Sequence, residues 1–447
     1  MRITPHSVLL GSTVKDVAPR IVPRTLKGFL DELPERAIVK ERCIERSKRV
    51  FRDFGFAPID TPALEYSEVL LGKLDPDSEV QRQIYQFRDH GDREVALRFD
   101  LTVPFARFAA QHAQAIGLPF KRYHVAPVWR GENPQAGRQR EFVQADIDII
   151  GTTSPVADAE VLALICRLMA TLDVSRYELR INDRQLLRSK LAALGATGNL
   201  EAVLRAIDKL EKQGPSTVTR ELQGQGLSQD VVSGVIELCA LRGPAVDVLG
   251  KLDEGAERLS AVVDIALSAG ADRSKLVLDL SIARGLDYYT STVFETFLVD
   301  LPGIGSVCSG GRYDDLAGLY SKEPLPGVGA SLGLTRLLDA WKQLGVQKFE
   351  TNTPARVLVL QFPDAARASA SVARTIRDAG IPTELYPDSK KIANQLRYAE
   401  RRGHRAAVLY GPDEQERGLV KVRDLHARTE AAVDLDRMIQ HLTELLG

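Results

Sequence analysis

The sequence predicts an α+β protein with a large sheet-containing domain, a helical domain inserted into it, and a small C-terminal α/β domain. Three observations lead to this prediction. Residues 120–150 read as a hairpin, two extended runs around a loop rich in Gly, Asn and Pro. Residues 188–266 carry helical patterns broken by glycines and prolines, with no strand pattern. From residue 354 onward, strand and helix patterns alternate as in a mostly parallel sheet. We therefore place an N-terminal extension at 1–24, the sheet domain at 25–187 and 267–348, the insertion at 188–266, and the last domain at 354–447.

Composition limits the kind of protein. The chain has 447 residues, 44% hydrophobic and 27% charged, which is typical of a globular protein with several domains. Lys and Arg number 59 against 60 acidic residues, so a nucleic-acid site has to be a local basic patch. No apolar run is long enough to span a membrane, and no signal peptide is evident. The scattered cysteines argue against a zinc site or disulfides and favour a cytoplasmic location: Cys43, Cys166, Cys239 and Cys308.

The second run of the hairpin alternates clearly between two kinds of side chain. One face carries Val143, Ala145, Ile147 and Ile149, and the other carries Phe142, Gln144, Asp146 and Asp148. The polar face fits either a half-exposed strand that meets water or the floor of a binding site. Arg130 and Arg138 bracket the loop, so a site here would suit a cationic ligand with an anionic end, such as an amino acid joined to a phosphate.

Other elements of the first half follow from capping and proline signals. A helix is predicted over 34–54, ending at Gly55. The extended segment 56–65 carries two prolines, which suits an edge strand or an interface, although a plain loop fits as well. A strand beginning at Glu94 leads into a helix that starts at about Pro104. Thr102 either points with Asp100 toward a ligand or caps this helix.

Glycines and arginines mark the second half. A helix is predicted over 156–172, and strands over 177–181, 276–280, 292–298 and 309–314. The Gly310–Gly311 pair permits a close approach of ligand to backbone, or marks a bulge or turn. Residues 327–336 lead into a helix, and Arg336 there is either a site residue or a solvated charge. In the last domain, strands are predicted at 356–360, 382–386 and 405–410, helices ending at about 379 and covering 389–402, then two strands and a final helix.

Several motifs together resemble the histidyl-tRNA synthetases, which are class II aminoacyl-tRNA synthetases. The resemblance runs from about Leu26 to the C-terminus. The segment ending at Pro62 resembles class II motif 1, residues 128–132 with Phe142 resemble motif 2, and residues 329–336 resemble motif 3. Residues 284–289 (RGLDYY) and 310–314 (GGRYD) resemble the two histidine-specific motifs, and 97–107 (LRFDLTVPFAR) matches a form seen in many members. The resemblance implies a mixed, mainly antiparallel sheet of the class II synthetase type.

The resemblance also implies a site for histidine. Asp100, Thr102 and Gln144 would hold the α-ammonium group, and Asp148 and Tyr289, with Tyr288 beside it, would contact the imidazole ring. Arg130 and Arg284 would bind the substrate carboxylate and the α-phosphate as catalytic residues. Many members carry Glu where this chain has Asp148, so a bridging water is expected at the shorter side chain.

For ATP, the resemblance implies contacts from two strands and a helix. Arg336 and Arg138 would hold the β- and γ-phosphates, Phe142 and Arg336 would stack on adenine, and Glu132 would lie at its edge. Mg²⁺ would bridge phosphate oxygens. Many members carry Glu at the position of Thr335, so no protein side chain is assigned here as a metal ligand.

The resemblance further implies tRNA(His), L-histidine and ATP as partners, and a cytoplasmic homodimer. On the helix over 389–402, Lys390, Asn394, Arg397 and Arg401 share one face and would contact tRNA, although a solvated charged face fits equally well. The alternative is a non-catalytic relative, such as the regulatory subunit of ATP phosphoribosyltransferase or a sensor of uncharged tRNA.

Overall fold

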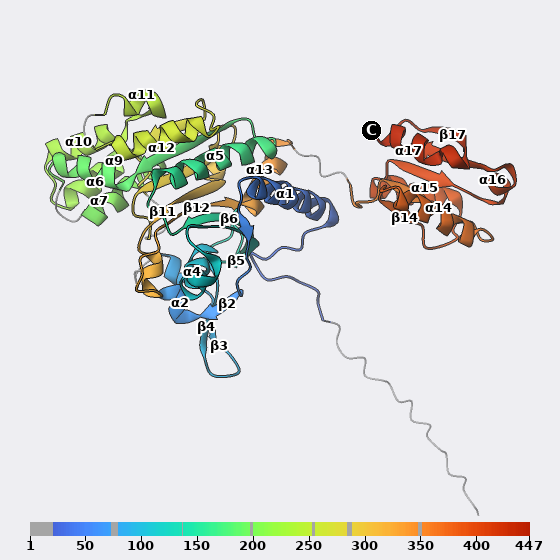
Figure 1. The fold of residues 1–447 in the computed structure, drawn as a ribbon, viewed down its shortest axis with the longest axis horizontal. Coiled ribbons are helices and arrows are strands. Elements are labelled where there is room, and N and C mark those ends of the chain that lie inside the picture. Colours follow the sequence, from blue (N-terminus) through green and yellow to red (C-terminus); the bar gives the residue numbers. More distant parts are fainter. Residues whose placement is uncertain are drawn as a thin grey trace, which may run out of the picture.

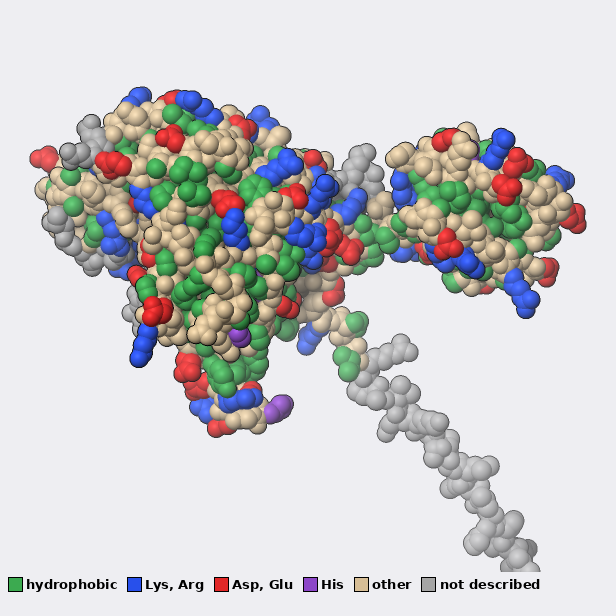
Figure 2. All heavy atoms as spheres, in the orientation of Figure 1, with side chains coloured by type: hydrophobic (Ala, Val, Ile, Leu, Met, Phe, Trp, Pro, Cys, Tyr) green, Lys and Arg blue, Asp and Glu red, His purple; other side chains and the backbone are tan. Residues whose placement is uncertain are grey.

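The computed structural model describes residues 21–72, 79–135, 137–196, 200–252, 255–283, 288–346 and 351–447. The large domain comprises the described residues 21–346, and the C-terminal domain comprises 351–447 (Figure 1). On the face drawn in Figure 2, basic and acidic side chains are interspersed, as expected at a net charge of -1. Among the described residues, every helix is too short or too polar to cross a bilayer.

The large domain is built on a nine-stranded sheet. Within the described residues, β1 pairs with β5 and β7 with β9 in parallel, and the remaining neighbours are antiparallel. The mixed, mainly antiparallel sheet is therefore confirmed. In spatial order the strands are β1 (Ala57–Pro58), β5 (Phe120–Trp129), β6 (Glu141–Ile150), β12 (Gly327–Gly333), β11 (Cys308–Tyr313), β10 (Thr292–Leu298), β7 (Tyr177–Asp183), β9 (Leu276–Asp279) and β8 (Arg242–Pro244).

The predicted hairpin at 120–150 is confirmed as β5 and β6. Their register places Arg122 opposite Asp148 and Trp129 opposite Glu141. Gly137 closes the loop with φ 72°, a conformation that favours glycine. The proline-bearing segment 56–65 supplies β1, which lies at the sheet edge as predicted, since proline cannot donate to a second neighbour.

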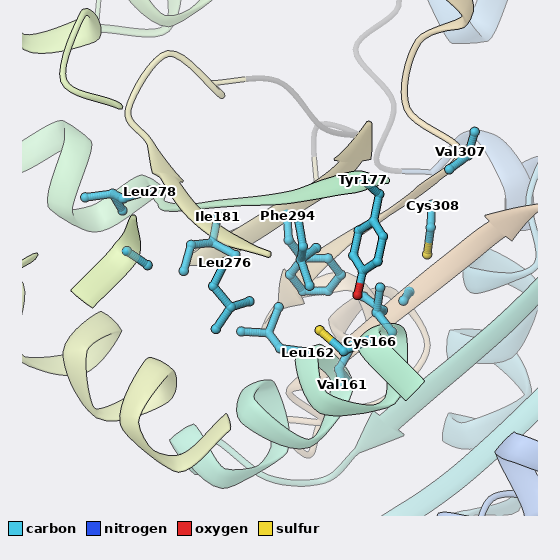
Figure 3. Close-up of a cluster of buried hydrophobic side chains, with 14 of the residues drawn as sticks. Val161, Leu162, Cys166, Tyr177, Ile181, Leu276, Leu278, Phe294, Val307 and Cys308 are labelled. Carbon is cyan, nitrogen blue, oxygen red and sulfur yellow. The ribbon is translucent and has the colours of Figure 1, made fainter. Parts of the chain in front are cut away.

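The two faces of β6 enter different cores. Ile147 and Ile149 belong to the main core beneath the helices, where α5 packs along the sheet and the Tyr177 ring reaches toward Cys166 (Figure 3). Ile150 packs on the opposite face, with Phe105 and Tyr313. The helices on the main-core face are α1 (Pro34–Asp53), α5 (Pro155–Thr171), α12 (Glu257–Ser268) and α13 (Leu334–Leu344).

A smaller layer covers the opposite face of the hairpin. It contains a three-stranded antiparallel sheet in the order β2–β4–β3. Its core side chains come from α4, β4 and the 316–325 segment. Its elements are β2 (Leu64–Tyr66), α2 (Ser67–Leu71), α3 (Glu79–Arg82), β3 (Gln86–Arg88), β4 (Glu94–Leu97), α4 (Thr102–Ile116) and η2 (Leu316–Leu319). A short 3-10 turn, η1 (Pro302–Ile304), precedes β11.

The segment 188–266 is mostly helical, but the expectation that it holds no strand is wrong. The three-residue strand β8 adds to the sheet edge beside β9, a pairing too short to give an alternating pattern. The helices share one hydrophobic core with the sheet, through residues such as Leu191, Val235 and Leu259. They are α6 (Arg184–Ala193), α7 (Leu200–Ile207), α8 (Leu210–Gln213), α9 (Pro215–Gly224), α10 (Gln229–Cys239), α11 (Ala245–Leu249) and most of α12.

The C-terminal domain has its own cores on both faces of a five-stranded sheet ordered β14–β13–β15–β16–β17. The expectation of a mostly parallel sheet is wrong, because β15, β16 and β17 pair antiparallel. The connection from β15 to β16 is too short for a parallel crossover. Its elements are β13 (Val357–Val359), α14 (Ala366–Asp378), β14 (Thr383–Leu385), α15 (Ile392–Arg402), β15 (Ala406–Leu409), α16 (Pro412–Arg417), β16 (Leu419–Asp424), β17 (Thr429–Asp434), η3 (Leu435–Arg437) and α17 (Met438–Leu446).

Candidate active site

The polar face of β6 is buried. Gln144, Asp146 and Asp148 are only 8%, 1% and 2% exposed. The interpretation of this face as a solvated strand surface is therefore wrong. Residues of α4 and Tyr288 pack on the same side of the sheet, around Ile150, and keep water away. Buried carboxylates are costly unless they find partners, so this face is built for a specific interaction.

Asp148 is held from the adjacent strand β5 and from β11, which lies beyond β12 in the sheet. The Tyr313 hydroxyl donates to Asp148 Oδ1 at 2.6 Å, and Arg122 forms an ion pair with Oδ2. Gly329, opposite Asp148 on β12, leaves space for the carboxylate. A Cβ there would lie 2.5 Å from Asp148 Cγ and closer still to Oδ1. A side chain at this position would displace Asp148, so the motif 3 glycine is a requirement of the site.

Asp100 joins this pocket from the loop before α4. Its Oδ1 accepts from the backbone N–H of Val103 at 3.1 Å, and its Oδ2 accepts from the Tyr288 hydroxyl at 3.0 Å. The helix begins at Thr102, two residues before Pro104, and Leu101 occupies the cap position. Capping by Thr102 is therefore wrong, because the Asp100 carboxylate satisfies the first turn.

The tyrosine pair packs against a glycine strand. The Tyr288 and Tyr289 rings meet edge to face, with centroids 5.0 Å apart. A Cβ on Gly311 would lie 2.9 Å from Tyr289 Cδ1, so this glycine makes room for the ring. Gly310 instead faces Phe294 and the Gly329 carbonyl. Both lie within the regular strand β11, so the reading as a bulge or turn is wrong, and the close approach is to protein atoms.

Burial raises the pKa of all three carboxylates. It raises the pKa of Asp146 to about 7 and that of Asp148 to about 6, and it raises the pKa of Asp100 as well. The positive charge of Arg122 opposes each shift. Because a nearby cation favours ionised carboxylates, a ligand with an ammonium or imidazolium group would be stabilised in this pocket.

An open cleft adjoins the pocket at Gln144. The Gln144 amide donates to Ser331 Oγ at 2.8 Å, and among the described residues its Oε1 finds no partner. That oxygen is a free acceptor at the junction of two subsites. The cleft is lined by Arg130, Glu132, Gly137, Arg138, Gln139, Phe142, Gln144, Ser306, Val307, Ser309, Ser331, Gly333 and Arg336.

Three arginines give the cleft a positive charge. Arg130 donates to the Phe99 carbonyl at 3.0 Å and lies over the Phe142 ring, with 5.1 Å from Cζ to the centroid. Arg138 pairs with Glu132 at 3.2 Å, the one acidic side chain in the lining. The third cation, Arg336, is described next. Such a surface suits a polyanion beside an aromatic ring.

Arg336 is half-buried at the start of α13, so its reading as a solvated charge is wrong. It donates to the carbonyls of Ser306 and Gly137. Burial, followed by repulsion from Arg138 and Arg130, lowers its pKa to about 10. It remains a cation at neutral pH, and an anion between the three arginines would relieve their mutual repulsion.

Thr335 is occupied structurally. Its hydroxyl accepts from the backbone N–H of Val143 at 3.1 Å, and the residue is 6% exposed. In the described part of the chain, His, Cys, Asp and Glu side chains nowhere gather in threes as a metal site would need. The residues therefore do not fit a metal ion held by a protein cage.

Two groups of predicted residues fall outside this geometry. Arg284 lies outside the described residues, so its role stays a prediction. In the C-terminal domain, Asn394, Arg397 and Arg401 are exposed on α15, and Lys390 is exposed in the segment before it. Lys390 precedes the helix, which begins at Ile392, so the four-residue helical face is wrong for its first member. Lys390 pairs instead with Asp388 at 3.4 Å.

The sequence did not reveal the side chains that hold the polar residues of β6 in place. Arg122 lies opposite Asp148, and this follows from the hairpin register once the loop is centred near residue 135. Tyr313 was within a recognised motif but had no assigned role. Ser331, which holds Gln144, lies across from Asp146 on β12 and had no signal in the sequence.

The sheet, the hairpin with its arginines and the glycine strand leading into α13 define a class II aminoacyl-tRNA synthetase. Comparisons with known proteins specify the family. The family described as Histidyl-tRNA synthetase matches residues 28–337, and the Anticodon binding domain family matches 355–445. The chain belongs to the histidyl-tRNA synthetase family.

Individual relatives cover nearly the whole chain. It is 48% identical to the histidine–tRNA ligase of Rhodopirellula baltica over 417 residues, 91% of this chain and 94% of that protein. It is 42% identical to the ligase of Wolinella succinogenes, with 91% and 94% covered. The crystal structure of a histidyl-tRNA synthetase from a Nostoc species superimposes with a TM-score of 0.86 at 30% identity, covering 95% of this chain and all of that one.

Proposed function

We propose that this chain is a histidine–tRNA ligase. The carboxylate of histidine attacks the α-phosphorus of ATP, and pyrophosphate leaves that phosphorus, which gives histidyl-adenylate. The terminal ribose hydroxyl of tRNA(His) then attacks the carbonyl carbon, and AMP leaves. The observation that supports this most directly is the buried acidic floor of β6, which adjoins a cleft with three arginines. The acidic face of β6 would bind the cationic groups of histidine, and the cleft would bind the phosphates of ATP.

We assign histidine to the pocket around β6. Asp100, Thr102 and the free Gln144 oxygen would accept from the α-ammonium group, since a cation needs acceptor oxygens. Asp148 and Tyr289, with Tyr288 at their side, would contact the imidazole ring. A site with polar partners for a ring nitrogen rejects isosteres that lack it, because its own buried groups would be left unpaired.

We assign ATP to the cleft. Arg130 would bind the α-phosphate and the substrate carboxylate, with Arg284 opposite it. Arg138 and Arg336 would hold the β- and γ-phosphates, while Phe142 and Arg336 stack on adenine and Glu132 lies at its edge. No protein nucleophile is needed, so the residues act by positioning the reactants and neutralising charge. Mg²⁺ would enter with the phosphates, because the described residues offer it no cage.

We assign tRNA to the C-terminal domain, where Lys390 just before α15 and Asn394, Arg397 and Arg401 along it expose polar and basic groups. Single-stranded loops are recognised through such groups, by contacts to phosphates and to bases turned outward. The match to an anticodon-binding family over 355–445 supports this assignment.

We propose a homodimer in the cytoplasm. Support for a second copy comes from exposed apolar side chains on the β2–β4–β3 sheet, namely Leu64, Tyr66 and Phe87, at 39%, 49% and 49%. Figure 2 shows hydrophobic side chains gathered in this lower part of the large domain. Support for the compartment comes from the four cysteines, which are unpaired and buried.

The test is histidine-dependent exchange of pyrophosphate into ATP, followed by charging of tRNA(His). A ligase gives both activities. The alternative, a regulatory relative that senses histidine, would bind histidine without exchange. The whole-length similarity to ligases and the C-terminal domain favour the ligase. Histidine binding without exchange would refute the proposal.

A further inference from the structure

We propose that Arg122 is a positioning residue for histidine selection, holding Asp148 ionised and oriented toward the imidazole pocket. This inference rests on the proposed function, since it concerns the residue assigned to the ring. Arg122 is completely buried on β5, directly across from Asp148. Its side chain has no exposed surface and pairs with Asp148, so we assign its effect on the reaction to the groups it touches.

The contacts of Arg122 fix its charge in place. One Nη2 hydrogen bond goes to the Leu101 carbonyl at 3.0 Å, and the same nitrogen pairs with Asp148 Oδ2. The guanidinium lies over the Phe105 ring, 4.6 Å from the centroid. Its Nε and Nη1 find no hydrogen-bond partner among the described residues. A buried arginine with so few hydrogen bonds is a poor choice for structure alone, so its charge is what the pocket uses.

The surroundings of Asp148 explain why a fixed cation is needed. The titratable and charged groups around it are Arg122 on β5, Asp146 on its own strand, Asp100 before α4, Tyr313 on β11, and Tyr289. Burial favours the neutral acid of Asp148 most strongly, and the negative charge of Asp100 adds to this effect. Arg122 is the one cation in this set, so its removal would leave Asp148 protonated at neutral pH. A neutral acid offers a weaker acceptor to a ring N–H.

The experiment compares Arg122→Met and Arg122→Lys with the wild-type chain. Histidine affinity is measured by titration calorimetry from about pH 5.5 to about pH 9, so that the ligand's own titration is common to all curves. In the wild type, affinity should fall as the pH drops through about 6, the pKa to which burial raises Asp148. In Arg122→Met the fall should begin roughly one to three pH units higher. Near pH 7, affinity should then be weaker by about tenfold or more.

The lysine variant and a matched control separate charge from packing. Arg122→Lys keeps a cation and should keep a profile closer to the wild type. Arg180→Met removes another buried arginine, which pairs with Glu178 and lies 4.1 Å from the Phe297 ring centroid, away from the pocket. It should lower thermal stability and leave the pH profile of histidine binding unchanged.

The outcomes are distinct. If Arg122→Met binds histidine with the wild-type pH profile, the inference is overturned. If that variant does not fold, Arg122→Lys is compared with and without Asp148→Asn. If Arg122→Lys changes histidine affinity in the wild-type background but not in the Asp148→Asn background, the inference is supported. If the change in affinity is the same in both backgrounds, the inference is overturned. Failure of the proposed function looks different, because the wild type would then lack pyrophosphate exchange whatever the binding profiles show.

Discussion

Gly329→Ala should impair recognition of histidine through a single added methyl group. The new Cβ would lie 2.5 Å from both Asp148 Cγ and the Ile147 carbonyl oxygen, and closer to Asp148 Oδ1. Ordinary contacts between such atoms are about 3.5 Å, so the carboxylate has to move by about 1 Å. That movement would break the 2.6 Å bond from Tyr313 and misplace the acceptor proposed for imidazole.

The magnitude follows from the interaction that is lost. A hydrogen bond to a charged group contributes about 1.5–3 kcal/mol, which corresponds to a rise of roughly ten- to a hundredfold in the KM for histidine. Overpacking should also lower the free energy of unfolding by about 1–3 kcal/mol. The KM for ATP should change little, since Gly329 does not line the cleft.

Pyrophosphate exchange at varied histidine and ATP gives both KM values, and thermal unfolding gives the stability. The control is Gly234→Ala in α10, where a Cβ would crowd only the Leu194 side chain at 2.9 Å. This substitution overpacks the helical segment 188–266, away from the pocket around Asp148. If Gly329→Ala lowers the thermal stability but keeps the wild-type KM for histidine, Asp148 does not contact the imidazole ring of the substrate.

Four further outcomes are expected. Tyr289→Phe should raise the KM for histidine more than that for ATP in the exchange assay; unchanged constants would remove Tyr289 from the pocket. Arg284→Ala should slow exchange by about 10²–10³ with histidine binding retained, and near-normal turnover would exclude a catalytic role. Truncation after Thr353 should leave exchange largely intact and abolish tRNA charging; equal loss of both would assign the C-terminal domain to folding or assembly. Light scattering should give about twice the 49.2 kDa of one chain, and a monomer mass would contradict the proposed dimer.

The features predicted best from sequence were those with a strong local signal. The β5–β6 hairpin and its alternation came directly from the order of residues in 120–150. The edge position of β1 followed from the prolines predicted to keep the segment 56–65 out of the sheet centre, one of which lies in the strand. Helix α1 followed from a proline at its first turn and a glycine after its end. Each of these depends on neighbours within a few residues.

The features missed depend on contacts between distant segments. Strand β8 has three residues and exists only because β9 offers an edge. The antiparallel direction of β16 follows from the short connection between β15 and β16. Patterns of apolar and polar residues do not show this direction. Arg122 looked like one more charge in a mixed run, and its burial becomes evident only when Asp148 lies across from it. The motif residues gave the positions of the site, whereas tertiary packing gave the partners that hold them.

The single hydrophobic core beneath the sheet has a consequence for how the chain opens. Helices from 188–266 contribute side chains such as Leu204 and Val232 to the same core as α5 and the central strands. Such a shared core makes the helical segment and the sheet one cooperative unit, in which backbone amides of both exchange with solvent through the same opening. The C-terminal domain, with separate cores, can open while that unit stays closed. If the C-terminal domain binds tRNA as proposed, its opening would release the tRNA while the activated amino acid stays bound in the large domain.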